Sequence, residues 1–210
     1  MIFFPRFNRT IPYPFYIKGR EDVIHIHITK TAGTSLQLSM KFNKVAQSNK
    51  TKKHYFVKEV IDIVGQEHWD KTFKFTFVRN PWDRLYSLYR YKQRKKSIAT
   101  EEQGNSFGLW LKSAISNQEG KPYFKSRSQM EWINNFDEKI DLDFIGRFES
   151  LEPDVKKLGQ LLDMKISLPH INQGLPIVHY SEAYDDELEE LVRTHYKEDI
   201  DMFNYTFHRK

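Results

Sequence analysis

Residues 30–35 combine small and hydroxylated side chains with one lysine, a composition suited to binding a phosphate or sulfate group. The stretch consists of Lys30, Thr31, Ala32, Gly33, Thr34 and Ser35. Small residues allow backbone N–H groups to close around an anion, and the lysine and the hydroxyls add directed donors. The lysine precedes the glycine, so the stretch differs from the pattern G-x-x-x-x-G-K-S/T. The alternative is an ordinary turn between a strand and a helix, with a Thr or Ser capping the helix.

A second basic position follows at Arg79, directly after another apolar segment. In ATPases that use magnesium, the comparable strand supplies an aspartate that holds the metal ion. A guanidinium at this place favours a second anionic group instead, and Ser87, two turns further along, could donate a hydroxyl to it. The alternative is that Arg79 and Arg84 pair only with Asp83 and with other acidic residues of the surface.

Each of these two positions requires a strand before it and a helix after it. In residues 23–28 apolar and polar residues alternate, which predicts a strand, and helical spacing follows up to about residue 42. Residues 72–78 are rich in phenylalanine and predict a second strand. After it, Asn80 can cap a helix and Pro81 can take the first helical position. Both candidate anion sites therefore lie where a strand passes into a helix.

The remaining periodic segments continue this alternation of strands and helices. A third strand is predicted over residues 142–145, and helices are predicted over residues 55–64, 107–115, 153–162 and 185–202. Gly65 is placed to end the helix before it. Strands separated by helices favour a mostly parallel sheet covered on both faces, with ligand loops beyond the carboxyl ends of the strands. We therefore expect an α/β fold with a P-loop-like core, built in three layers (α/β/α) around a mostly parallel central sheet.

The composition bounds the class of protein. The 210 residues are expected to form one domain, residues 1–210, that begins with an extended arm over residues 1–20. Cysteine is absent, which excludes disulfides, thiolate metal sites and cysteine nucleophiles. No apolar run reaches the roughly 18 residues that a membrane-spanning helix requires, so no transmembrane segment is predicted. A net charge of +5 favours anionic partners without choosing among them.

Taken together and in this order, the motifs resemble the sulfotransferases that use 3′-phosphoadenosine-5′-phosphosulfate (PAPS), and in particular their carbohydrate-type branch. Residues 30–35 resemble the loop that binds the 5′-phosphosulfate, and residues 79–87 resemble the segment that binds the 3′-phosphate. Three later segments resemble further landmarks of that branch, namely residues 143–149, 168–172 and 196–207. The resemblance extends over about residues 23–207 but leaves the arm and residues 92–128 unmatched. We interpret residues 92–128 as an insertion that determines acceptor specificity.

The resemblance implies a role for each residue that would bind the donor. Lys30 would hold the bridging oxygen and the leaving phosphate, and residues 31–35 would cradle the 5′ end. Arg79 and Ser87 would hold the 3′-phosphate that distinguishes PAPS from ATP, and Arg147 would contact the nucleotide. The donor would be PAPS and the product PAP, and this arrangement requires no metal ion.

Sulfuryl transfer also needs a base for the proton of the acceptor hydroxyl, which in this family is usually a histidine or a glutamate. His54 is the predicted base, because it lies between the loop and the second strand, where related enzymes carry a catalytic histidine. Its neighbours Lys52 and Lys53 favour the neutral, basic imidazole. The alternative is a solvated histidine at the start of a helix. His27 lies near the loop but among buried strand residues, which favours a structural role.

The acceptor side is predicted from weaker signals. Its candidate residues are Lys53, Arg127, Gln129 and His170. For Arg127 and Gln129 the alternative is a polar helix surface, and for Arg147 it is a salt bridge to Glu149 or Glu152. The basic runs 50–53 and 90–96 are expected to be solvated faces or, if functional, to steer an anionic glycan.

The predicted function is sulfuryl transfer from PAPS to an acceptor hydroxyl of an anionic or neutral glycan, by in-line displacement with His54 as the base. One alternative is an ATP-dependent kinase of small molecules, which should need magnesium and an acidic ligand. The other is a noncatalytic module that binds glycans or nucleic acid. Nucleic acid is not expected as a partner, because such a module does not explain cations after successive strands. The expected compartment is the cytoplasm, or the Golgi lumen for a catalytic domain whose membrane anchor has been removed.

Overall fold

The computed structural model describes residues 13–42, 54–95, 107–116, 124–168 and 178–210. Its sheet has four strands in the spatial order β1 (Tyr16–Ile17), β2 (Arg20–Ile26), β3 (Phe73–Val78) and β4 (Phe144–Arg147). β2, β3 and β4 are parallel, while β1 pairs antiparallel with β2. The prediction of an α/β fold with a mostly parallel sheet is confirmed.

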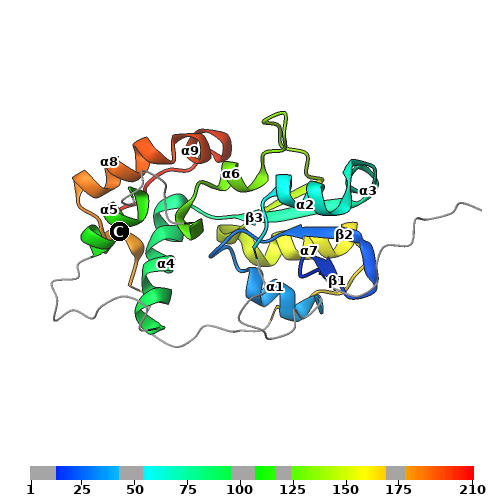
Figure 1. The fold of residues 1–210 in the computed structure, drawn as a ribbon. Coiled ribbons are helices and arrows are strands. Elements are labelled where there is room, and N and C mark those ends of the chain that lie inside the picture. The colour runs from blue at the N-terminus through cyan, green and yellow to red at the C-terminus, as the bar shows by residue number, and fades with distance from the viewer. Residues whose placement is uncertain (1–12, 43–53, 96–106, 117–123, 169–177) are drawn as a thin grey trace, which may run out of the picture.

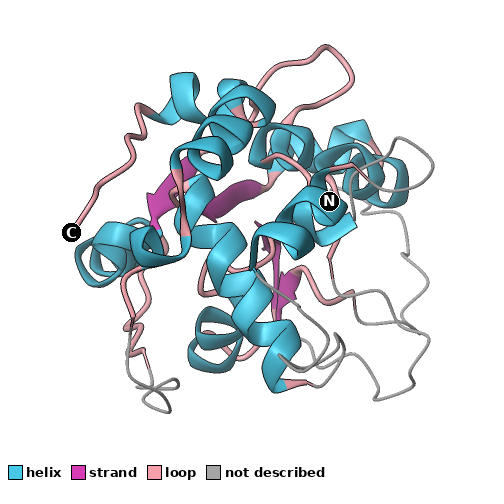
Figure 2. Ribbon diagram, turned by 90° about the vertical axis from the view of Figure 1, so that its left-hand side faces the viewer, coloured by secondary structure: helices cyan, strands magenta, loops and turns pink. Residues whose placement is uncertain are grey.

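Helices cover the strands on both sides, as Figure 1 and the turned view in Figure 2 show. The described α-helices are α1 (Gly33–Ser39), α2 (Val57–Val64), α3 (Gln66–Lys71), α4 (Pro81–Arg94), α5 (Phe107–Ile115), α6 (Gln129–Ile133), α7 (Leu151–Leu161), α8 (Asp186–His195) and α9 (Lys197–Phe203). Helices α4, α5, α8 and α9 gather beside one end of the sheet (Figure 1).

The alternation within β2 divides the core into two parts. Ile24 and Ile26 belong to a large apolar cluster that includes residues of α2, α4, α5 and α8. Val23 belongs to a second cluster, on the other face, with Phe75 and with Leu36 of α1 and Leu158 of α7. Because the buried side chains of β2 divide between two clusters that involve different helices, the sheet is the middle layer of three.

The predicted strand-to-helix junctions are present. Asn80 accepts a hydrogen bond from the Trp82 N–H through its side chain, and Pro81 begins α4, as the sequence predicts. Gly65 does end α2, but α3 begins directly after it and was not predicted. Gly65 has φ 82°, which turns the chain sharply enough for a second helix to start at the next residue.

The single helix predicted over residues 185–202 is wrong, because the chain forms two helices that meet at Tyr196. Tyr196 leaves helical geometry, its side chain is fully buried, and its hydroxyl donates to the Ser126 carbonyl at 2.5 Å. The helical periodicity of the sequence continues across this point, but burial of the tyrosine interrupts the helix.

The predicted arm and the predicted insertion both contribute residues to the fold. Part of the predicted N-terminal arm forms β1 and extends the sheet at one edge. Within the predicted insertion, Phe107, Trp110 and Leu111 of α5 are buried in the large cluster. No helix in the described part of the chain is long and apolar enough to cross a membrane.

The register of the parallel strands determines where the candidate site lies. Ile26 of β2 stands opposite Thr76 of β3, and Val78 of β3 stands opposite Arg147 of β4. The segments that follow β2 and β3 therefore leave the sheet at the same edge. This brings Lys30 and Arg79 together although 49 positions separate them.

Candidate functional site

The loop after β2 has a constrained backbone. Lys30 and Ala32 both have positive φ, 68° and 67°, a conformation that is uncommon for residues other than glycine. The Thr31 hydroxyl is buried and donates to the Ile28 carbonyl at 3.0 Å, which closes the turn. Strained backbone of this kind is concentrated at functional sites, because the surrounding structure must stabilise it.

The side chains of the loop differ in exposure. Thr34 is exposed and Ser35 is half-buried in the first turn of α1, whereas Gly33 is buried. Lys30 is half-buried, and its ammonium lies over the ring of Tyr91 in α4, 4.7 Å from the ring centroid. The loop thus combines a lysine, two accessible hydroxyls and close backbone packing.

Several cations surround Lys30 and change its protonation. Burial, together with the nearby charges of Arg79, Arg94 and Lys125, lowers the pKa of Lys30 to about 8. Among the described residues, no carboxylate lies within ion-pair distance of Lys30 or Lys125. The site therefore has a positive electrostatic potential, and a bound anion would neutralise part of its charge.

Arg79 lies beside this loop and is held on several sides. Its Nη1 donates to the Lys30 carbonyl at 3.1 Å, and its Nε and Nη2 both donate to Asp83 at 2.8 Å. The guanidinium lies 3.7 Å from the centre of the Phe148 ring. Arg79 therefore does pair with Asp83, which was the alternative given for it above. It also hydrogen-bonds directly to the loop.

The backbone of Arg79 is held by a buried amide. The side chain of Gln129 accepts from the Arg79 N–H and donates to the Arg79 carbonyl, both at 2.8 Å. Gln129 is fully buried and also hydrogen-bonds to Asp199, whose carboxylate accepts two backbone N–H groups of α6. The structure thus gives Gln129 a part in supporting Arg79, whereas the sequence predicted an acceptor contact.

Arg84 is not a surface residue, which corrects the alternative proposed for it. Its side chain is buried and donates to the backbone carbonyls of Lys125, Ser126 and Arg127, at 3.4, 3.3 and 2.5 Å. Thr29, the residue before Lys30, also donates to the Lys125 carbonyl, at 2.7 Å. These bonds tie residues 125–127 to the start of the loop that follows β2.

His54 lies next to the same loop. Its Nδ1 is 2.9 Å from the His27 carbonyl, and the centres of the two imidazole rings are 4.3 Å apart. A carbonyl oxygen can only accept, so this hydrogen bond requires the proton on Nδ1. In the neutral ring, Nε2 is then the nitrogen that can take up a proton.

The other predicted residues occupy different surroundings. Ser87 is half-buried on α4, one turn beyond Asp83. Arg147 donates to the Phe203 carbonyl at 2.7 Å, and its guanidinium lies 5.1 Å from the centroid of the Tyr205 ring. These contacts differ from the salt bridge to Glu149 or Glu152 that was the alternative for Arg147. Arg127 pairs with Glu131 at 3.3 Å. The candidates Lys53 and His170 lie outside the described residues.

No sequence motif pointed to Lys125, and Tyr91 stood out only as a tyrosine of the basic run 90–96 that could stack on a sugar. Lys125 has its ammonium over the Tyr91 ring, 5.9 Å from the centroid, on the same ring that Lys30 contacts. Neither residue stands in a recognisable motif, since Lys125 lies in a short turn (Phe124–Ser126) that reaches the loop only through tertiary contacts. The basic run at 90–96 was the one signal near Tyr91.

Comparison with known proteins assigns the chain to a family. A model of the sulfotransferase family matches residues 13–206. This chain belongs to the sulfotransferase family. The match includes β1 and residues 92–128. The resemblance inferred from the motifs did not cover these two segments.

Two individual proteins are also similar to this sulfotransferase. An uncharacterised protein of Archaeoglobus fulgidus is 28% identical over 106 residues, which cover 50% of this chain and 77% of the other. A crystal structure of a sulfotransferase from Alicyclobacillus acidocaldarius superposes with a TM-score of 0.47 and 11% identity, covering 92% of this chain and 90% of the other.

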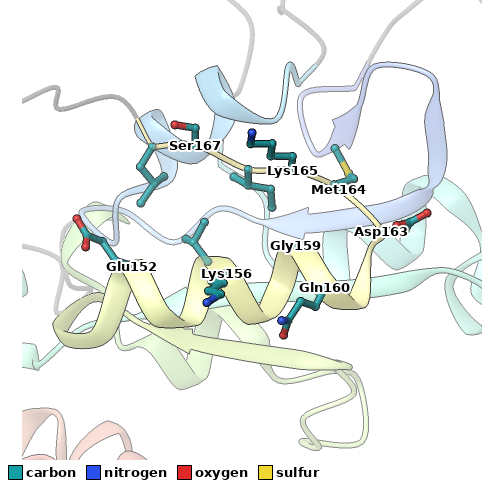
Figure 3. A pocket seen from close by; sticks show the side chains of 11 residues that line it. Glu152, Lys156, Gly159, Gln160, Asp163, Met164, Lys165 and Ser167 are labelled. Atoms are coloured by element: carbon teal, nitrogen blue, oxygen red, sulfur yellow. The ribbon is translucent and has the colours of Figure 1, made fainter.

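A separate pocket lies away from these residues. It has a volume of about 570 Å³ and lies between α7 and residues 163–168, which run back along that helix (Figure 3). None of the candidate site residues lines it. In the described part of the chain, no group of three or more His, Asp or Glu side chains is arranged to hold a metal ion.

We expect Gln129→Met to lower the free energy of unfolding by about 1–3 kcal/mol, because it leaves buried backbone groups of Arg79 without their partner. Chemical denaturation followed by circular dichroism measures this change. The matched control is Gln160→Met on the exposed side of α7, for which a change within about 0.5 kcal/mol is expected. Equal stability of the two variants would contradict the supporting role of Gln129.

Proposed function

We propose that this sulfotransferase uses PAPS as its donor and transfers the sulfuryl group to a hydroxyl of a glycan, with His54 as the base. The proposal rests on family membership and on the convergence of two cations at one edge of the sheet. The observation that carries it is the hydrogen bond from Arg79 to the Lys30 carbonyl, which joins the two predicted phosphate-binding positions.

The donor set suits a nucleotide with phosphate at both ends. Lys30 and the hydroxyls of Thr34 and Ser35 would bind the 5′-phosphosulfate, where charge develops on the leaving phosphate. Arg79 and Ser87 would bind the 3′-phosphate, and Arg147 would contact the nucleotide. Family membership favours this donor over the ATP and magnesium of the kinase alternative.

The ion pair with Asp83 leaves part of the Arg79 guanidinium available to a phosphate. A guanidinium has five N–H donors, and Asp83 and the Lys30 carbonyl take three of them. The remaining two can bind a phosphate while Asp83 and Phe148 hold the group in a fixed orientation. Such preorganisation reduces the entropy lost when the donor binds.

The proposed reaction is an in-line displacement at sulfur. The acceptor oxygen forms a bond to sulfur as the bond between sulfur and the bridging oxygen breaks, and PAP leaves with that oxygen. The acceptor proton passes to Nε2 of His54, because Nδ1 already donates to the His27 carbonyl. The positive charge of Lys30 stabilises the charge that develops on the departing phosphate.

A glycan acceptor is supported by the cations and rings beside Lys30. Tyr91 presents a ring to both Lys30 and Lys125, and Arg94 and Lys125 add positive charge that the donor phosphates do not require. Sugar rings stack on aromatic side chains, and carboxylates or sulfates of an acidic glycan would pair with the lysine and arginine. Arg127, Lys53 and His170 remain predicted acceptor contacts.

We expect PAP to raise the melting temperature of the protein in the presence of EDTA, and ATP to raise it much less. The physical reason is that two separated cationic positions match the 5′- and 3′-phosphates of PAP. Lys30→Ala should abolish the shift, while His54→Ala should retain it and reduce the turnover of labelled sulfate at least about a hundredfold. Stabilisation by ATP that requires magnesium would contradict the proposed donor, and an active His54→Ala enzyme would contradict the proposed base.

The affinity for PAP should fall as the pH rises above about 8. Because burial and nearby cations lower the pKa of Lys30 from 10.5 to about 8, the free protein loses this charge above pH 8, and binding must then take up a proton. The dissociation constant should increase by up to about tenfold per pH unit in that range. Titration calorimetry between pH 6.5 and 9.5, at about 0.1 M salt, measures it.

The control for this titration is Lys30→Arg, whose guanidinium stays protonated over the whole range. We expect its PAP affinity to change little above pH 8. An equal fall in both proteins would assign the pH dependence to a residue other than Lys30.

A further inference from the structure

The side chain of His27 lies between the proposed base, His54, and residues 30–35, which are called the donor loop below. His27 directly follows β2 and is only 9% exposed. One side of its ring faces Gly33, where α1 begins, and the His54 ring lies 4.3 Å away, centre to centre. His27 is thus in contact with both parts of the site that must act together.

The contact with Gly33 explains why this position carries a glycine. A Cβ at residue 33 would lie 1.9 Å from Nε2 and 2.0 Å from Cδ2 of His27, far inside contact distance. Gly33 is not among the residues with positive φ, so the backbone itself would accept alanine there. The imidazole of His27 is therefore what excludes a side chain at this point of the loop.

The contact with His54 has two components. The backbone carbonyl of His27 binds Nδ1 of His54 at 2.9 Å, which determines the tautomer, and the two rings pack at an interplanar angle of 50°. Displacement of the His27 ring would therefore move the proposed base relative to the loop. Misplacement of a reacting group by about 1 Å can reduce the rate about a hundredfold.

The His27 ring is itself supported by the sheet. The ring of His25 is stacked with it at 5.5 Å and an interplanar angle of 18°, and the ring of Phe75 is stacked with that of His25 at 4.7 Å. Both His25 and Phe75 are buried. Pairwise ring contacts thus connect Phe75 in the core through His25 and His27 to His54, and close-packed interiors relax little.

We infer that His27 is a positioning residue that sets the distance between the donor loop and His54, and that residue 33 is glycine because of it. The inference rests on the proposed function, since it assigns His54 the role of base. His27 itself needs no contact with donor or acceptor.

The experiment combines His27→Ala with Gly33→Ala and measures PAP affinity and kcat separately. Gly33→Ala should weaken PAP binding at least about tenfold, because the new methyl displaces the loop or the ring. His27→Ala should change PAP affinity less than about threefold but lower kcat about 10- to 100-fold. In the double variant PAP affinity should return to within about threefold of wild type, while kcat stays as low as in His27→Ala.

His27→Phe is the conservative variant, because it keeps a ring of similar shape between Gly33 and His54. Its kcat should stay within about threefold of wild type. Full kcat in His27→Ala, loss of kcat in a His27→Phe enzyme that binds PAP, or failure of His27→Ala to restore PAP binding to Gly33→Ala would each overturn the inference.

The failure of the proposed function would look different. Wild-type protein that neither binds PAP nor transfers sulfate would contradict the function. The steric contact between His27 and residue 33 could still be tested by measuring free energies of unfolding. Gly33→Ala should lower the free energy of unfolding of the wild-type protein and raise that of the His27→Ala variant. Equal effects of Gly33→Ala in both backgrounds would overturn the coupling itself.

Discussion

The hydrogen bond from the Arg79 guanidinium to the Lys30 carbonyl joins the segments that follow two parallel strands, and the candidate site depends on it. Two cations at the same edge repel one another, so the fold must hold them together by other interactions. The parallel register of β2 and β3 brings their backbones close, and Asp83, Phe148 and the Lys30 carbonyl then orient the arginine. The result is a positively charged site formed before any anion arrives.

A second group of buried polar residues supports this arrangement through hydrogen bonds to the backbone. Gln129 holds the backbone of Arg79, and Asp199 holds Gln129 and the start of α6. Arg84 carries a buried charge, for which nearby Asp199 supplies the opposite charge, and it ties residues 125–127 to the loop. Buried charges are costly unless they are paired and hydrogen-bonded, and here both the Arg84 guanidinium and the Asp199 carboxylate have hydrogen-bond partners. Donors that are already in position need little reorganisation when charge develops in the transition state.

The sequence predicted the parts of the fold that depend on local patterns. The alternation before Lys30, the cap at Asn80 and the helical spacing after Pro81 are all encoded within about ten residues, and each is present. What could not be predicted depends on contacts between distant segments. The end of α8 at Tyr196 follows from burial of its ring against residue 126, and the role of Gln129 follows from contact with Arg79, 50 positions earlier. His27 could be placed near the loop, but its contact with both Gly33 and His54 required the packing of α1 and residue 54 around β2.

The central claim is that the end of β3 recognises a second phosphate of the donor. Titration calorimetry with PAP and with AMP, which lacks the 3′-phosphate, tests it most directly when wild type is compared with Arg79→Ala. We expect wild type to bind PAP at least about tenfold more tightly than AMP, a difference of about 1.4 kcal/mol. In Arg79→Ala this preference should fall to about twofold or less. An Arg79→Ala protein that keeps the full preference for PAP would contradict the account and leave Arg79 with its ion pair to Asp83 as a purely structural contact.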